Sequence, residues 1–188
     1  ILIAQLTAGA SFTATLNGAP KLDGDLDNGI VCHEFGHGIS NRLTGGPLNT
    51  SCFGHAEQGG EGYSDYFTLM MTTNWATALP TDGTLPRPIG NYAAGQSNLG
   101  PGIRNYPYST NITTNPLTYA NMGVAPIGTQ QHNIGEILCT ALWEMTWGLI
   151  QQDGINTNFF NPNGIGGNTV ALKLVVEGLR TQPCNPGY

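Results

Sequence analysis

The sequence predicts an α+β fold that is mainly α-helical, with a short β region at the N-terminus. Two observations carry this prediction. Apolar residues recur at helical spacing in several stretches beyond residue 27, whereas residues 1–20 alternate between apolar and polar positions. No internal repeat and no linker-like segment interrupts the 188 residues, so a single unit over 1–188 is expected.

The N-terminal region has the alternation typical of β-strands. Two short apolar series are separated by Gly9 and ended by Gly18-Ala19-Pro20, which are turn-forming residues. One or two short strands are therefore expected within 1–20. The alternating residues are Leu2, Ala4 and Leu6, followed by Phe12, Ala14 and Leu16.

The first helix is expected to have Asp27 or Asn28 as its N-cap and to run to about Leu43. The acidic stretch 23–28 supplies an N-cap, and Gly45-Gly46-Pro47 ends the helix. The acids also match the first, third, fifth and twelfth positions of a calcium loop. Asparagine stands where such loops need glycine, so capping is favoured and calcium binding is kept as the alternative.

A second helix is expected from about Gly60 to Asn74, followed by an irregular segment over 76–131. The second helix has four residues spaced for burial, namely Tyr63, Phe67, Met70 and Met71. The irregular segment is rich in proline, glycine and asparagine, and so long a loop in one domain usually has a function.

A third helix is expected over about 134–152 and a last, short one over 170–179, with an Asn- and Gly-rich loop over 153–168 between them. Trp143 and Trp147 lie on the apolar side of the third helix. Core packing explains this pair better than ligand stacking.

The sequence His33-Glu34-Phe35-Gly36-His37 is the strongest chemical signal in the chain. Residues four apart on a helix share one face, so both imidazoles can reach one zinc ion. Glu34 points about 100° away round the helix, where a base that activates water belongs. The alternative is an ordinary helix surface that carries two titratable histidines.

A hydrolytic zinc site has three protein ligands, so a third ligand must come from elsewhere. The candidates are His55, Glu57, Glu61, Asp65 and His132. Glu61 and Asp65 are four residues apart on the second helix and share a face. We favour Glu61 as the ligand, with Asp65 accepting a hydrogen bond from His33.

Composition narrows the classes of partner. The net charge is −6, and no cluster of lysine or arginine is present, which argues against nucleic acid or an anionic membrane surface as partner. No apolar run is long enough to span a bilayer. The weakly charged, Gly- and Pro-rich composition is typical of a secreted enzyme, and the chain is expected to be a mature or excised piece of a longer precursor.

The four cysteines do not form a Cys-x-x-Cys pair, which argues against a cysteine zinc site. Cys32 and Cys139 fall in helical patterns and are expected to be buried thiols. Cys52 and Cys184 fall in loops and could pair in an oxidising compartment, although the spacing alone does not rank the possible pairings.

The chain resembles the fungalysin family of secreted zinc metallopeptidases, which belong to the thermolysin-like group with a His-Glu-x-x-His motif and a glutamate ligand. The similarity covers most of residues 23–188. The matching segments are 23–29, His33 to Pro47, 56–58, Glu61 to Asp65, 102–104, 107–110, 115–119, His132 to Glu136 and 182–186.

The resemblance implies that His33, His37 and Glu61 bind zinc. It also implies that Glu34 is the catalytic base. The remaining matches assign Asp65 to orienting a ligand histidine, His132 to stabilising the oxyanion and Arg104 to binding a substrate carbonyl. The chain differs from the family at Tyr63, where tryptophan is more common, and at Gly59, where a larger residue is usual.

The expected activity is that of a secreted zinc endopeptidase with peptide or protein substrates. The resemblance also implies that the 188 residues are part of a larger thermolysin-like catalytic domain, whose remainder or pro-segment is a potential partner. Two alternatives remain: a zinc-binding fragment or scaffold module without turnover, and an aminopeptidase.

Overall fold

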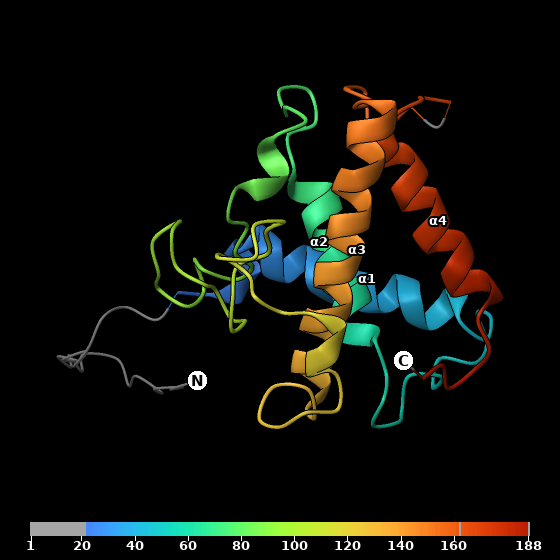
Figure 1. The fold of residues 1–188 in the computed structure, drawn as a ribbon. Helices are drawn as coiled ribbons and strands as arrows, with labels where there is room; N and C mark the ends of the chain where they lie inside the picture. The colour runs from blue at the N-terminus through green and yellow to red at the C-terminus, as the bar shows by residue number, and fades with distance from the viewer. Residues whose placement is uncertain (1–21, 162, 188) are drawn as a thin grey trace, which may run out of the picture.

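The computed structural model describes residues 22–161 and 163–187, which form four α-helices and short 3-10 turns (Figure 1). The α-helices are α1 (Asn28–Leu43), α2 (Gly60–Thr72), α3 (Gln131–Asp153) and α4 (Gly167–Thr181). The 3-10 turns are η1 (Gly24–Leu26), η2 (Asp82–Thr84) and η3 (Tyr119–Asn121).

The helical part of the predicted α+β fold is confirmed, and the β part is not seen. The strands expected within 1–20 lie outside the described residues. Over 22–161 and 163–187 the backbone forms only two isolated bridges, which join Arg87 to Tyr108 and Ile89 to Gly102. Both bridges lie in the long irregular segment, where they tie one part of that segment to another.

The helix α1 begins and ends where the sequence predicts. Asp27 is the N-cap, and its Oδ1 accepts hydrogen bonds from the backbone N–H groups of Gly29 and Ile30, at 2.8 and 3.4 Å. Its other oxygen accepts from the backbone N–H of Ala93 at 3.0 Å, which ties the irregular segment to the helix start. The capping role of Asp27 is therefore confirmed, while calcium binding stays a prediction.

The helix α2 packs between α1 and α3, with its backbone close to both (Figure 1). A Cβ atom added to Gly36 of α1 would lie 2.7 Å from the Cα atom of Ser64, which is shorter than any real contact. On the other side, a Cβ atom on Gly62 would lie 2.4 Å from the backbone oxygen of Gly135. Glycines thus allow three helices to approach closely where the candidate site residues lie.

The expected burial of Met71 is wrong, because its side chain is 50% exposed near the C-terminal end of α2. Met70 is fully buried, and adjacent residues on a helix point about 100° apart, so only one of the two methionines faces the core. The helix also ends at Thr72, two residues before the expected boundary.

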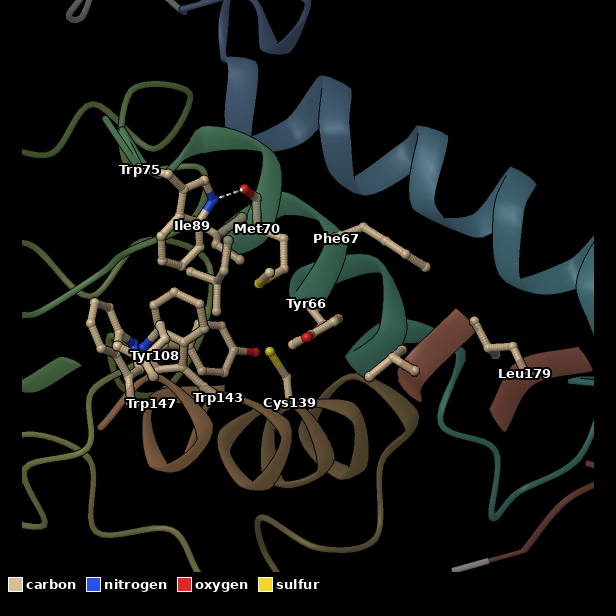
Figure 2. Close-up of a cluster of buried hydrophobic side chains, with 13 residues drawn as sticks. Tyr66, Phe67, Met70, Trp75, Ile89, Tyr108, Cys139, Trp143, Trp147 and Leu179 are labelled. Atoms are coloured by element: carbon tan, nitrogen blue, oxygen red, sulfur yellow. Dashed lines mark hydrogen bonds between the residues drawn. The ribbon is translucent and has the colours of Figure 1, made fainter. Parts of the chain in front are cut away.

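The main hydrophobic core lies where α2 and α3 meet the chain around Trp75 and Tyr108 (Figure 2). Trp143 and Trp147 are 1% and 2% exposed, so their predicted role in core packing is confirmed. The indole N–H of Trp75 donates to the backbone oxygen of Met70 at 2.8 Å, which holds the chain after α2 against this core.

A disulfide between Cys52 and Cys184 joins the loop after α1 to the C-terminal segment, with a Cα–Cα distance of 4.6 Å. Of the two remaining cysteines, Cys139 is buried as expected, whereas Cys32 is only partly buried.

The last two helices are longer than expected. The helix α3 begins at Gln131, because the side chain of Gln130 accepts hydrogen bonds from the next turn and caps the helix. The helix α4 packs along α3 and extends from Gly167 to Thr181. No helix among the described residues is both long and apolar enough to cross a membrane.

Candidate metal centre

Three metal-ligating side chains converge where α1 meets α2. The Nε2 atoms of His33 and His37 are 3.1 Å apart, and carboxylate oxygens of Glu61 lie 3.3 Å from His33 and 3.5 Å from His37. The ligand atoms all lie within 4.8 Å of one another. No other group of three such residues occurs in the described part of the chain.

These distances fit a tetrahedral zinc ion. Ligand atoms at about 2.0–2.1 Å from zinc lie roughly 3.3 Å from each other when the bond angles are tetrahedral. The observed separations are 3.1, 3.3 and 3.5 Å. Two histidines and a glutamate also form the ligand set of catalytic zinc sites, which keep the fourth position for water or substrate.

Asp65 lies one turn beyond Glu61 on α2 and is fully buried. Its Oδ1 atom is 2.7 Å from Nδ1 of His33. An ionised carboxylate can only accept, so His33 donates this hydrogen bond through Nδ1–H. The other ring nitrogen, Nε2, faces the ligand cluster and offers its lone pair to a metal ion when the ring is neutral.

The centre holds two carboxylates, those of Glu61 and Asp65, and both pair with the guanidinium group of Arg104. Burial lowers the pKa of His33, but hydrogen bonds to Asp65 and Glu61 outweigh this effect and raise the pKa to about 9. Burial and the nearby His33 lower the pKa of His37. A metal ion would compete with this proton, because a histidine ligand must be neutral to bind a metal.

Glu34 is exposed and lies one residue beyond His33 on α1. Its charge opposes the lowering of the His37 pKa, and its carboxylate is not part of the ligand cluster. An ionised carboxylate in this position can take a proton from a water molecule.

His132 lies in the first turn of α3 and not ahead of that helix, because Gln130 caps the helix earlier than expected. Its Nε2 atom is 3.4 Å from Oε1 of Glu61, and its side chain is 46% exposed. Its Nδ1 atom is 2.6 Å from Nε2 of Gln130. The imidazole is therefore held at the edge of the ligand cluster, with one side open to solvent.

Arg104 is buried behind the ligands and binds both carboxylates. Its Nε and Nη2 atoms donate to Asp65 at 2.6 and 2.9 Å, and Nη2 also donates to Glu61 at 3.2 Å. Within the described residues Nη1 makes no hydrogen bond. The guanidinium thus orients the two acidic side chains and keeps one nitrogen for a further acceptor.

The other two candidates for the third ligand lie apart from the cluster. Nε2 of His55 is 2.8 Å from the backbone oxygen of Pro186, so this histidine joins two loops near the disulfide. Glu57 is exposed. Of the five candidates, Glu61 is the one that meets both histidines.

Sequence reasoning did not assign a role to Tyr108 or Glu136. The Tyr108 hydroxyl donates to Asp65, and Glu136 accepts from the backbone N–H groups of Asn105 and Tyr106 at 3.1 and 2.8 Å. Glu136 falls on the apolar face of its helix. A carboxylate at a core-facing position is almost always paired, so the sequence pattern could have predicted that Glu136 has a structural partner.

The fold and the ligand cluster define a class of protein. Two histidines and an intervening glutamate on one helix, completed by a glutamate from the next helix, are typical of zinc-dependent metallopeptidases. The model of the family described as Fungalysin metallopeptidase (M36) matches residues 12–188. The chain belongs to the fungalysin family, and the resemblance inferred from its motifs is confirmed.

Curated relatives are fungal proteins named as extracellular metalloproteinases. Extracellular metalloproteinase 2 is 41% identical in Trichophyton tonsurans and 42% identical in Trichophyton rubrum, each over 176 residues. Extracellular metalloproteinase MEP of Pyricularia oryzae is 39% identical over 176 residues. Each match covers 90% of this chain and 26% of the relative, so the chain spans about a quarter of the length of these proteins.

Proposed function

We propose that this chain is the metal-binding core of a zinc-dependent endopeptidase that hydrolyses peptide bonds in extracellular proteins. The observation that carries the proposal is the convergence of His33, His37 and Glu61 within 4.8 Å, with Glu34 exposed beside them. Bound zinc would supply a Lewis acid that polarises the peptide carbonyl and lowers the pKa of water.

The side chains around the ligands have complementary tasks in this proposal. Glu34 takes a proton from water and passes it to the departing amine. His132 donates a hydrogen bond to the carbonyl oxygen as negative charge develops on it. Arg104 binds a second substrate carbonyl through Nη1, while Asp65 keeps the ring of His33 in its orientation.

Secretion is part of the proposal. The relatives described above are named extracellular metalloproteinases. The disulfide between Cys52 and Cys184 also fits secretion, because disulfides persist in oxidising compartments. Peptides or proteins are the expected substrates. The rest of a longer catalytic domain, or a pro-segment, is the expected partner, since the chain spans 26% of its relatives.

The same coverage supports a second candidate function, a zinc-binding module without turnover. A surface against which an extended substrate pairs usually needs a strand edge, and the described residues offer only isolated bridges. In this case the chain would bind zinc and leave peptides intact.

Metal analysis and peptide hydrolysis separate the two functions. The 188-residue chain should bind one zinc ion and cleave unfolded casein, and a chelator should abolish the cleavage. Glu34→Gln should keep zinc and lose nearly all activity, because an amide cannot take a proton from water. Glu144→Gln, an exposed change on α3, is the matched control and should leave activity unchanged.

Three results decide between the alternatives. One zinc ion without cleavage would favour the silent module, and the absence of zinc would refute both functions. Cleavage of peptides with a blocked N-terminus would exclude an aminopeptidase.

A further inference from the structure

The buried residue Tyr108 lies behind the metal centre and belongs to none of the roles assigned above. Its side chain is fully buried among the aromatic residues of the core, between Trp143 and Cys139 (Figure 2). Its backbone is held by the bridge to Arg87, with N–O distances of 2.8 and 3.0 Å. The backbone and the packed ring together fix where the hydroxyl group points.

That hydroxyl donates to Oδ2 of Asp65 and completes the hydrogen bonding of this carboxylate. Oδ2 also accepts from Nε of Arg104 at 2.6 Å. Oδ1 accepts from Nδ1 of His33 at 2.7 Å and from Nη2 of Arg104 at 2.9 Å. A carboxylate has about four acceptor positions, and here each one faces a donor.

We propose that Tyr108 is a positioning residue for the metal ligand His33 and acts through Asp65. A fully paired carboxylate has one orientation, so it presents Oδ1 to the histidine ring at a fixed place. The ring then donates through Nδ1–H and turns the lone pair of Nε2 toward the metal position. This inference rests on the proposed zinc site.

The partner of this hydroxyl distinguishes Tyr108 from an ordinary core tyrosine. Tyr66 is equally buried in the same core, but its hydroxyl pairs with the neutral hydroxyl of Thr146 at 3.2 Å. That hydrogen bond involves neither the metal ligand His33 nor its partner Asp65. Tyr66→Phe therefore removes the same atom from the same core and should leave the metal centre intact.

The segment that carries Tyr108 is held in place from the other side by Glu136 on α3. Its carboxylate accepts from the backbone N–H groups of Asn105 and Tyr106 and from the side chain of Asn105. Arg104 directly precedes these two residues, and Tyr108 follows them after Pro107. One buried glutamate thus holds the segment that carries two of the three residues that donate to Asp65, as a preorganised site requires.

The test is the zinc affinity of Tyr108→Phe in the 188-residue chain, measured by competition with a chromophoric chelator. Removing a direct hydrogen-bond partner of a ligand weakens metal binding by about 10- to 100-fold. Tyr108 is one hydrogen bond further from the ligand His33 than Asp65 is, so for Tyr108→Phe we expect zinc binding that is about 3- to 10-fold weaker. Tyr66→Phe should bind zinc as tightly as the unchanged chain.

A double-mutant cycle shows whether the effect passes through Asp65. Asp65→Asn alone should weaken zinc binding, and adding Tyr108→Phe to it should cause no further loss. In the metal-free chain, the proton NMR signal of Nδ1–H of His33 should move in Tyr108→Phe and stay in place in Tyr66→Phe.

Four outcomes would overturn the inference. They are equal zinc affinity in Tyr108→Phe and the unchanged chain, equal losses in the two tyrosine variants, additive losses in the cycle, and an unmoved His33 signal. If the unchanged chain bound no zinc, the proposed function would fail along with the inference. Normal zinc binding that is insensitive to Tyr108 would refute the inference alone.

Discussion

Replacing Gly36 by alanine tests whether the close approach of α1 and α2 sets the metal site. Gly36 lies between the two ligand histidines, and a Cβ atom at this position would be 2.7 Å from Cα of Ser64. The same atom would be 3.2 Å from both Cβ and the backbone oxygen of Ser64. Two of these three atoms belong to the backbone of α2, so a side-chain rotation cannot relieve the contact.

The size of the effect follows from these distances. Carbon atoms pack at about 3.5–4.0 Å, so the helices must separate locally by about 1 Å. Overpacking of this kind costs about 1–3 kcal/mol, while alanine gains about 1 kcal/mol over glycine inside a helix. The free energy of unfolding should therefore fall by up to about 2 kcal/mol.

Zinc binding should be more sensitive than stability to this change. His33 and His37 lie on one side of the contact and Glu61 on the other, whereas metal–ligand distances tolerate changes of about 0.2 Å. A separation of about 1 Å should weaken zinc binding by at least the roughly 10- to 100-fold that follows when a ligand loses the partner that orients it.

Gly38→Ala provides the matched control on the same helix. Its added Cβ atom would meet only Nη1 of Arg42 at 3.7 Å, an ordinary contact. This variant should gain up to about 1 kcal/mol in urea unfolding and bind zinc normally. If Gly36→Ala matched Gly38→Ala in both unfolding and chelator competition, the close approach would not control the site.

Two further predictions concern the edge of the site and the disulfide. His132→Ala should lower kcat and kcat/KM together by about 10²- to 10³-fold while zinc content stays constant, and loss of zinc would instead make His132 a ligand. Cys52→Ser combined with Cys184→Ser should lower the free energy of unfolding by up to about 5 kcal/mol, because the disulfide closes a loop with a sequence separation of 132. Cys32→Ser, which breaks no disulfide, should have a small effect in the same urea titration, and equal losses in the two variants would remove the disulfide from the explanation.

The parts of the site that depend on helical spacing could be predicted from the sequence. His33 and His37 share a face because they are four residues apart, and the same spacing brings Glu61 and Asp65 to one side of the next helix. The sequence also indicated that the two pairs belong to one site. A hydrolytic zinc site needs a third ligand, and the second helix has carboxylates that can supply it.

Helical spacing could not predict which residues form hydrogen bonds with the carboxylates behind the ligand histidines. Arg104 and Tyr108 lie 39 and 43 residues beyond Asp65, in a segment without periodicity, so no local rule places them against α2. The start of α3 was also missed, because glutamine is a rare N-cap. As a result, the predicted position of His132 ahead of its helix was wrong. Its imidazole still lies beside Glu61, as the role implied by the resemblance requires.

All three candidate ligands come from α1 and α2, which are consecutive in the chain, and this order has a consequence for folding. Contacts between neighbouring helices form early, since little chain must be ordered before they are made. A metal ion could therefore be captured while the chain beyond α2 is still unfolded, and its binding energy would add to the stability of the helix pair. Arg104, Tyr108 and His132 would join later, so metal binding and the completion of the surrounding site become separate steps in the folding of this chain.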